Sequence, residues 1–69
     1  MTDFAIADLI KEQETEVMER RRFCLRHVAA GTMEREEAQR RIAVAEAILD
    51  RLRRMQTVEN IRRGIRQNR

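Results

Sequence analysis

Three kinds of side chain in this chain of 69 residues could do chemistry: one histidine, one cysteine and a series of carboxylates. Catalysis by His27 would need a nucleophile or a positioned acid beside it, but no acid lies one helical turn away. A solvated histidine at the end of a helix is the simpler interpretation. Cys24 lies among apolar residues, where a free cysteine behaves as a small hydrophobic side chain. We therefore expect no enzymatic activity and no catalytic residue.

The acidic residues Glu12, Glu16 and Glu19 follow one another at helical spacing. Di-iron bundles require a Glu-x-x-His motif on two helices, and zinc requires cysteine or histidine ligands at suitable spacing. Neither pattern occurs in this sequence. The series is typical of a solvated acidic face, or of a face that pairs with arginines on a second helix. We expect no metal site and no cofactor.

Arginine is the strongest functional signal, because the chain has fourteen arginines and one lysine. The planar guanidinium matches phosphate and carboxylate groups, although a GC-rich genome also favours arginine codons. No aromatic residue is interleaved for base stacking, and no known nucleic-acid-binding motif is present. The candidate residues for binding a partner or phosphate are Arg51, Arg53, Arg54, Arg62, Arg63 and Arg66.

Charge is also distributed unevenly along the chain. Residues 1–19 carry six acids against Lys11, a net charge of −5, whereas residues 51–69 carry seven arginines against Glu59, a net charge of +6. Such an asymmetry indicates an interaction surface or a self-complementary antiparallel pairing.

Composition and periodicity predict two helices. The chain has no proline and two glycines, and 39% of its residues are charged, which is typical of long helices with charged surfaces. We predict a first helix over about residues 3–30, begun after Thr2 or Asp3. Six polar residues at 11–16 interrupt its apolar face, which consists of Ile6, Ala7, Ile10, Val17, Cys24, Leu25 and Val28. Arg21 points into this face and must reach water or find a carboxylate.

Gly31 is suited to the left-handed conformation that ends a helix, and Thr32 is the expected N-cap of a second helix over about residues 33–56. The short turn at 31–32 makes the two helices antiparallel. Residues 1–56 therefore form one helical hairpin. Residues 57–69 form a basic C-terminal extension, either helical or frayed, since the apolar pattern shifts to another side after Gln56.

The apolar stripe of the second helix is wider than one neighbouring helix can cover. It spreads over roughly 160° of the helical wheel, whereas about 100° suffices for one neighbour. A chain this short also gains stability from self-association, and its single cysteine allows no internal disulfide. We therefore predict a homodimer, forming a four-helix bundle, that buries Ile42, Ala45, Ile48, Leu49 and Leu52.

About half of the chain, from Glu16 to Leu49, resembles a family of short helical-hairpin proteins of bacteriophages and prophages, mostly of undefined function. The residues that carry the resemblance are Glu16, Val17, Arg20, Arg22, Arg26, Val28, Gly31, Met33, Ala38, Ile42 and Ala43. The family often has Tyr-Pro-Arg-Trp where this chain has Cys24-Leu25-Arg26-His27. The missing proline indicates a straighter first helix here. The resemblance implies a phage or prophage origin.

Three functional hypotheses follow. The first is a small binding protein that blocks a host protein, with a host defence complex of the CRISPR type as a candidate target. The second is an arginine-rich bundle that binds nucleic acid, and the third is a structural or regulatory subunit. No apolar run approaches the roughly 18 residues of a membrane span. A lone cysteine and no signal peptide favour a cytoplasmic location, which is the host cytoplasm if the protein is phage-encoded.

Overall fold

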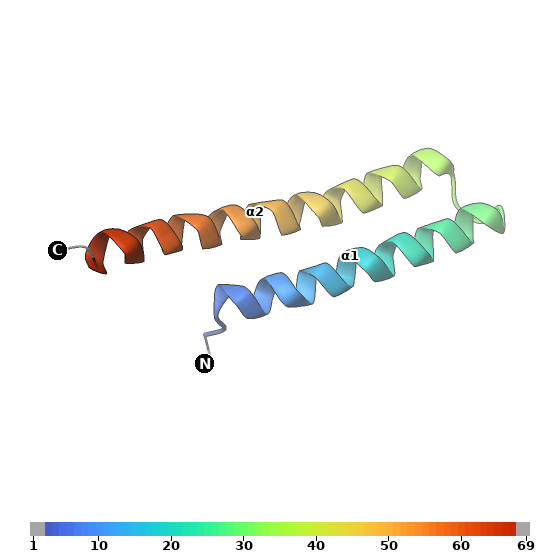
Figure 1. Ribbon diagram of the computed structural model, residues 1–69. Coiled ribbons are helices and arrows are strands. Elements are labelled where there is room, and N and C mark those ends of the chain that lie inside the picture. The colour runs from blue at the N-terminus through green and yellow to red at the C-terminus, as the bar shows by residue number, and fades with distance from the viewer. Residues whose placement is uncertain (1–2, 68–69) are drawn as a thin grey trace.

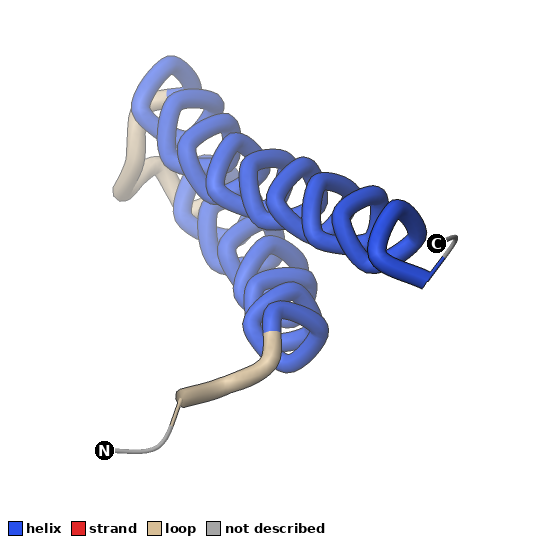
Figure 2. The backbone as a smooth tube through the Cα atoms, turned by 90° about the vertical axis from the view of Figure 1, so that its left-hand side faces the viewer, coloured by secondary structure: helices blue, strands red, loops and turns tan. Residues whose placement is uncertain are grey.

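The computed structural model describes residues 3–67, with side chains as far as Ile65, and consists of two helices. Helix α1 spans Ile6–Ala29 and helix α2 spans Arg35–Gln67. They lie side by side and antiparallel (Figures 1 and 2), within extents of 59 × 25 × 16 Å. The described part of the chain contains no strand. The predicted all-α hairpin is thus confirmed.

Helix α2 runs about eleven residues beyond the predicted end of the second helix. We call residues 57–67 the overhang, because they continue α2 past the start of α1 (Figure 1). Gln56 is the last residue of α2 that is half-buried before a run of exposed side chains. The helix continues because no proline interrupts it, and Gly64 costs only about 1 kcal/mol relative to alanine.

A glycine-dependent turn ends α1, as the sequence predicts. Gly31 has a φ of +76°, which a residue with a side chain adopts only with strain. The amide of Gly31 donates to the carbonyl of Val28 at 3.1 Å, and the amide of Thr32 donates to the carbonyl of His27 at 2.9 Å. These two bonds define a Schellman motif, which satisfies carbonyls at the helix end that would otherwise lack partners.

The predicted helix starts are wrong by a few residues. Thr32 does not cap α2, because its hydroxyl donates to the carbonyl of His27 at 3.2 Å and so belongs to the end of α1. Helix α2 starts instead after Glu34, whose carbonyl accepts from the amide of Ala38 at 3.0 Å. Helix α1 starts after Ala5, which provides no side-chain cap. Asp3 lies upstream of that start, and Thr2 lies outside the described residues.

The core is a narrow seam between the helices. Its buried residues recur at intervals of three, four and seven, the spacing of two helices that pack as a coiled coil. Leu25 and Ala7, both expected on the buried face, are exposed, and Leu25 is 66% accessible. The seam has no room for them, because a single neighbour covers only a narrow stripe of α1. The buried residues are Ile10, Val17, Cys24, Ala38, Ala45 and Leu49. Ile6 and Leu52 pack against them at the end of the hairpin that is far from the turn.

Gln13 lies in the polar stretch 11–16 and keeps this part of α1 in contact with α2. It lies between Ile10 and Val17 at seam spacing and is half-buried. Its Nε2 donates to the backbone carbonyl of Ala45 on α2 at 3.0 Å. A small side chain at Ala45 leaves that carbonyl within reach. The amide is thus satisfied inside the seam rather than left without a partner.

The two glycines should respond oppositely to alanine. Gly31→Ala forces a side chain into a left-handed conformation and should destabilise the hairpin by about 1 kcal/mol. Gly64→Ala lies within α2 with nothing within 4 Å of the added carbon, and should stabilise by up to about 1 kcal/mol. Urea denaturation followed by circular dichroism, at one fixed protein concentration, measures both. Equal effects of the two substitutions would contradict the assigned turn.

Adjacent residues of α2 should also respond differently to a buried charge. Leu49 is 8% exposed and Ile48 is 47% exposed. Leu49→Asp places an unpaired carboxylate in the seam and should unfold the hairpin, whereas Ile48→Asp should remain helical. Circular dichroism at micromolar concentration distinguishes the two. A helical Leu49→Asp protein would show that Leu49 is not a core residue.

Candidate functional site

Cys24 is fully buried. Its accessible surface is 0%, the lowest of the described residues. This agrees with the prediction of a small hydrophobic side chain, and it places Cys24 in the seam. A thiol in this position is out of contact with any substrate in solution unless the hairpin opens.

The side chain of His27 is half-buried and contacts the turn that follows α1. Its Nδ1 lies 2.6 Å from the hydroxyl oxygen of Thr32, and its ring centroid lies 4.2 Å from that of Phe23 at an interplanar angle of 43°. The hydroxyl oxygen of Thr32 also lies 3.2 Å from the carbonyl oxygen of His27, so the imidazole and the hydroxyl meet at the end of α1. The interpretation of His27 as simply solvated is therefore wrong, because its polar atom closes the turn.

Five of the described carboxylates form ion pairs with arginines, and they are not gathered around a cation site. No group of three metal-ligating side chains occurs within residues 3–67. Glu16 pairs with Arg20 on its own helix at 3.2 Å, and Glu14 pairs with Arg53 across the helices at 3.2 Å. Among the described side chains, none of Glu12, Glu16 and Glu19 pairs with an arginine of α2, and the pair of this kind between the helices is made by Glu14, which lies outside that series.

The six candidate arginines do not form one patch. Arg53 faces α1 and binds Glu14, and Arg54 binds Asp50 on its own helix at 2.8 Å. Arg51 and Arg62 share a different face of α2, since they lie eleven residues apart, which is close to three helical turns. Among the described side chains, no ion pair forms at Arg51, Arg62 or Arg63. The side chain of Arg66 lies outside the described residues.

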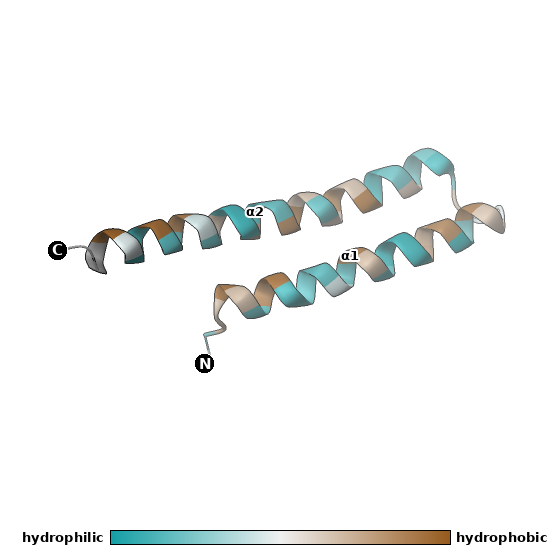
Figure 3. Ribbon diagram, in the orientation of Figure 1, coloured by the Kyte–Doolittle hydropathy of each residue, from teal (hydrophilic) through white to brown (hydrophobic). Residues whose placement is uncertain are grey.

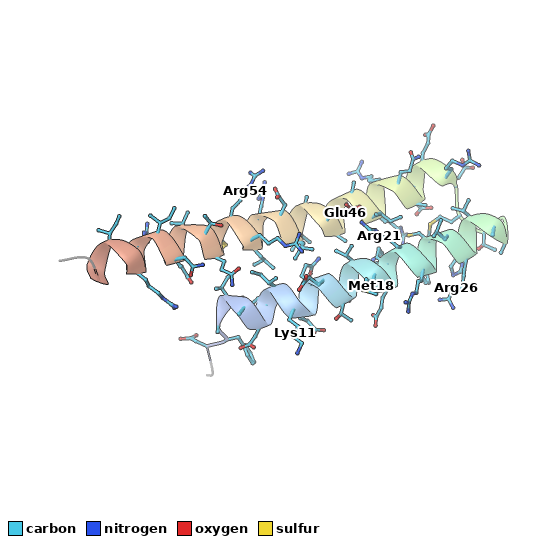
Figure 4. All side chains as sticks on the ribbon, viewed as in Figure 1. Lys11, Met18, Arg21, Arg26, Glu46 and Arg54 are labelled. Atoms are coloured by element: carbon cyan, nitrogen blue, oxygen red, sulfur yellow. The ribbon has the colours of Figure 1, made fainter. Side chains whose placement is uncertain are left out.

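One side of the hairpin is bridged by charge, and we call it the paired side. Arg21 on α1 reaches Glu46 on α2 at 3.3 Å (Figure 4). Arg53 on α2 reaches Glu14 on α1 at 3.2 Å. The sequence predicts that Arg21 must reach water or find a carboxylate, and its half-exposed side chain does both. The groove on this side is lined by Glu14, Val17, Met18, Arg21, Ala43, Glu46, Ala47, Leu49, Asp50 and Arg53.

The opposite side, which we call the open side, has no ion pair between the helices among the residues that the structure describes. Its ion pairs, Glu16–Arg20 and Glu37–Arg41, each stay within one helix. Among the described residues, the groove between the helices is therefore not bridged by charge here, and apolar atoms line much of it. Its lining residues are Gln13, Glu16, Arg20, Glu37, Arg40, Arg41, Val44, Ala45 and Ile48.

Large apolar side chains continue along α2 from this groove into the overhang. Together with two arginines they occupy positions at alternating intervals of four and three residues, so they lie along one face of the helix. Figure 3 shows apolar segments recurring to the far end of α2, beyond the start of α1. The aliphatic members are 47–67% exposed. We call this set the outer stripe: Val44, Ile48, Arg51, Met55, Val58, Arg62 and Ile65.

The residues predicted for a dimer core separate into two groups. Ala45 and Leu49 are buried, and Ile42 and Leu52 are half-buried, by the chain's own α1. Ile48 alone of the five is exposed and belongs to the outer stripe. The sequence reading missed that Val58 and Ile65 continue a face begun at Val44. The signal in the sequence is the alternating four- and three-residue spacing of positions 44, 48, 51, 55, 58, 62 and 65. From the sequence alone, the shift after Gln56 is interpreted as a break in the apolar pattern instead.

No helix within residues 3–67 combines the length and apolar character needed to cross a membrane. The described surface is that of a charged hairpin, and large apolar side chains are exposed on α1, at Leu9, Met18, Phe23 and Leu25, as well as on α2. Comparisons with protein-family models, with curated proteins and with solved structures find no match to this chain.

Proposed function

We propose that this protein is a non-enzymatic binding protein and that its open side docks on protein. The observation that carries the proposal is the outer stripe, whose aliphatic side chains remain about half exposed or more. Contiguous apolar surface on a small soluble protein usually marks an interaction site. Arginines within the stripe also suit a protein interface, where arginine is enriched relative to lysine.

The absence of catalysis is part of the same proposal. Its support is the position of the two side chains with intrinsic reactivity. Cys24 is buried in the seam, and Nδ1 of His27 is committed to Thr32. Each has a structural role, and neither lines the groove of the open side.

Two partners are proposed. The first is a second copy of the chain, which would form a four-helix bundle and supply the apolar contacts that one hairpin lacks. The second is a host protein, for which an inhibitor of a defence complex remains our candidate role. The support for a host target is the resemblance to phage proteins, together with the small size of the chain and its buried cysteine.

Nucleic-acid binding is the second candidate function, because Arg51, Arg62 and Arg63 form no ion pair among the described side chains. The geometry favours it less. Arg53 and Arg54 are already paired with carboxylates, and Arg51 and Arg62 alternate with aliphatic residues rather than forming a continuous basic row. Phosphate contacts require no such apolar surface.

A mobility-shift assay separates the two functions. We expect no shift of random duplex or single-stranded oligonucleotides at near-physiological salt with tens of micromolar protein, since even non-specific binders reach that affinity. A shift that disappears in Arg62→Ala/Arg63→Ala protein would overturn the assignment to protein binding.

Capture from host lysate treated with nuclease provides the complementary measurement. Ile48→Asp should lose any captured protein, because it places a charge in the proposed docking surface. Ala43→Asp is the matched control, since Ala43 is an exposed residue of α2 that lines the paired side. Equal capture by wild type and Ile48→Asp would exclude the open side as the docking surface.

A further inference from the structure

We propose that the open side is covered by a second copy of this chain, with the two α2 helices antiparallel and crossing near Met55. The inference rests on the proposed function, because it identifies the occupant of the same docking surface. Its consequence is that the basic overhang of each chain lies along the acidic first half of the partner's α1.

The outer stripe is suited to pairing with itself in this orientation. Its members span residues 44–65 and are spaced almost symmetrically about Met55, since Val44 mirrors Ile65, Ile48 mirrors Arg62 and Arg51 mirrors Val58. A two-fold interface brings the same patch of both chains together, so such a patch must be self-complementary. Antiparallel pairing places Ile65 of the overhang against Val44 and the aliphatic stem of Arg62 against Ile48.

Charge selects the antiparallel orientation. The overhang carries Arg62, Arg63 and Arg66 against Glu59. A parallel pair would place the two overhangs, and their arginines, beside each other, and like charges at close range are unfavourable. In an antiparallel pair the two overhangs lie far from each other, and each lies near the groove of the other chain.

Both acidic and basic residues border the place where the overhang would lie. Glu16 and Glu37 are paired with Arg20 and Arg41 on their own helices, and Arg40 lines the groove as well. Ile48 and Glu16 line the same groove, so this part of α2 lies level with the middle of α1. Glu12 and Glu19 lie one turn before and after Glu16 and share its face. Neither Glu12 nor Glu19 forms an ion pair among the described side chains, so both are available to arginines of a second chain.

The length of α2 supports the same occupant. The chain's own α1 covers α2 only as far as Gln56, and Val58, Ile61 and Ile65 are exposed beyond it. Two antiparallel copies would cover the overhangs without any further protein, because each overhang lies against the middle of the other α2. The excess length of α2 over α1 then has a role within the dimer itself.

Oligomeric state is the first test. Sedimentation equilibrium should give a dimer for wild type at tens of micromolar. Ile48→Asp should remain helical while its dissociation constant rises roughly hundredfold, and Ala43→Asp should remain a dimer. A wild-type monomer at 100 μM would overturn the inference, and the capture assay would still decide whether the open side docks on another protein.

A charge exchange between two variants tests the contact and its direction. Arg62→Glu/Arg63→Glu places acidic overhangs against acidic α1 helices, and Glu12→Arg/Glu19→Arg places basic overhangs against basic helices. Each variant alone should dimerise roughly tenfold more weakly at low salt. Mixed together they should form a heterodimer of wild-type strength, because both of its overhang contacts pair opposite charges. Homodimers as strong as wild type, or no heterodimer, would overturn the inference.

Spin labels measure the orientation directly. In a Cys24→Ala background, labels at Thr57→Cys lie near the proposed crossing and labels at Gln39→Cys lie far from it; both positions are exposed. With a rise of about 1.5 Å per residue, antiparallel helices place the Gln39 labels roughly 40 Å further apart than the Thr57 labels. Equal separations at the two positions would show a parallel dimer and contradict the proposal.

Discussion

The seam between α1 and α2 is narrow, and the exposed surfaces of the hairpin follow from that narrowness. Three of the residues buried in the seam, Ala38, Ala45 and Cys24, have small side chains. Small side chains at a helix contact let the two backbones approach closely. Close approach lets Gln13 reach the carbonyl of Ala45 and keeps the amide satisfied. It also means that each helix covers only a thin stripe of the other. The remaining apolar residues of α2 are therefore left at the surface, where the outer stripe continues for more than twenty residues.

Electrostatics gives the two sides of the hairpin different properties. On the paired side, Arg21–Glu46 and Arg53–Glu14 span the helices. Such exposed pairs add only about 0–1 kcal/mol each to stability, but they place four charged groups over one groove. On the open side, the charges of Glu16 and Glu37 are satisfied within their own helices. Among the described residues, that groove is thus crossed by the hydrogen bond of Gln13 but by no ion pair, which makes it the more accessible of the two to an apolar partner.

The sequence predicted the hairpin, the role of Gly31 and the burial of Cys24, because each depends on local chemistry. Helical composition, a left-handed turn and apolar periodicity are all visible within a few residues. The role of Thr32 was not predictable in the same way. Its hydroxyl could cap the start of α2 or donate to the last carbonyls of α1, and the conformation of the turn decides between the two. The separation of Ile48 from Leu49 also needed the structure. A helical wheel places both in one wide stripe, and only the position of α1 shows which part is covered.

The connection between the helices is short, and this determines how the hairpin can open. Residues 30–34 hold the helix ends together through the Schellman bonds and the contact of His27 with Thr32. Contacts near the turn close small loops, whereas the contact region of Ile6 and Leu52 closes a loop of more than forty residues. Since loop closure costs more entropy as the loop lengthens, opening should begin at the end far from the turn. Amide hydrogen exchange would then be slowest in the helix middles and turn-proximal halves, and fastest in the first turns of α1 and in the last turns of α2.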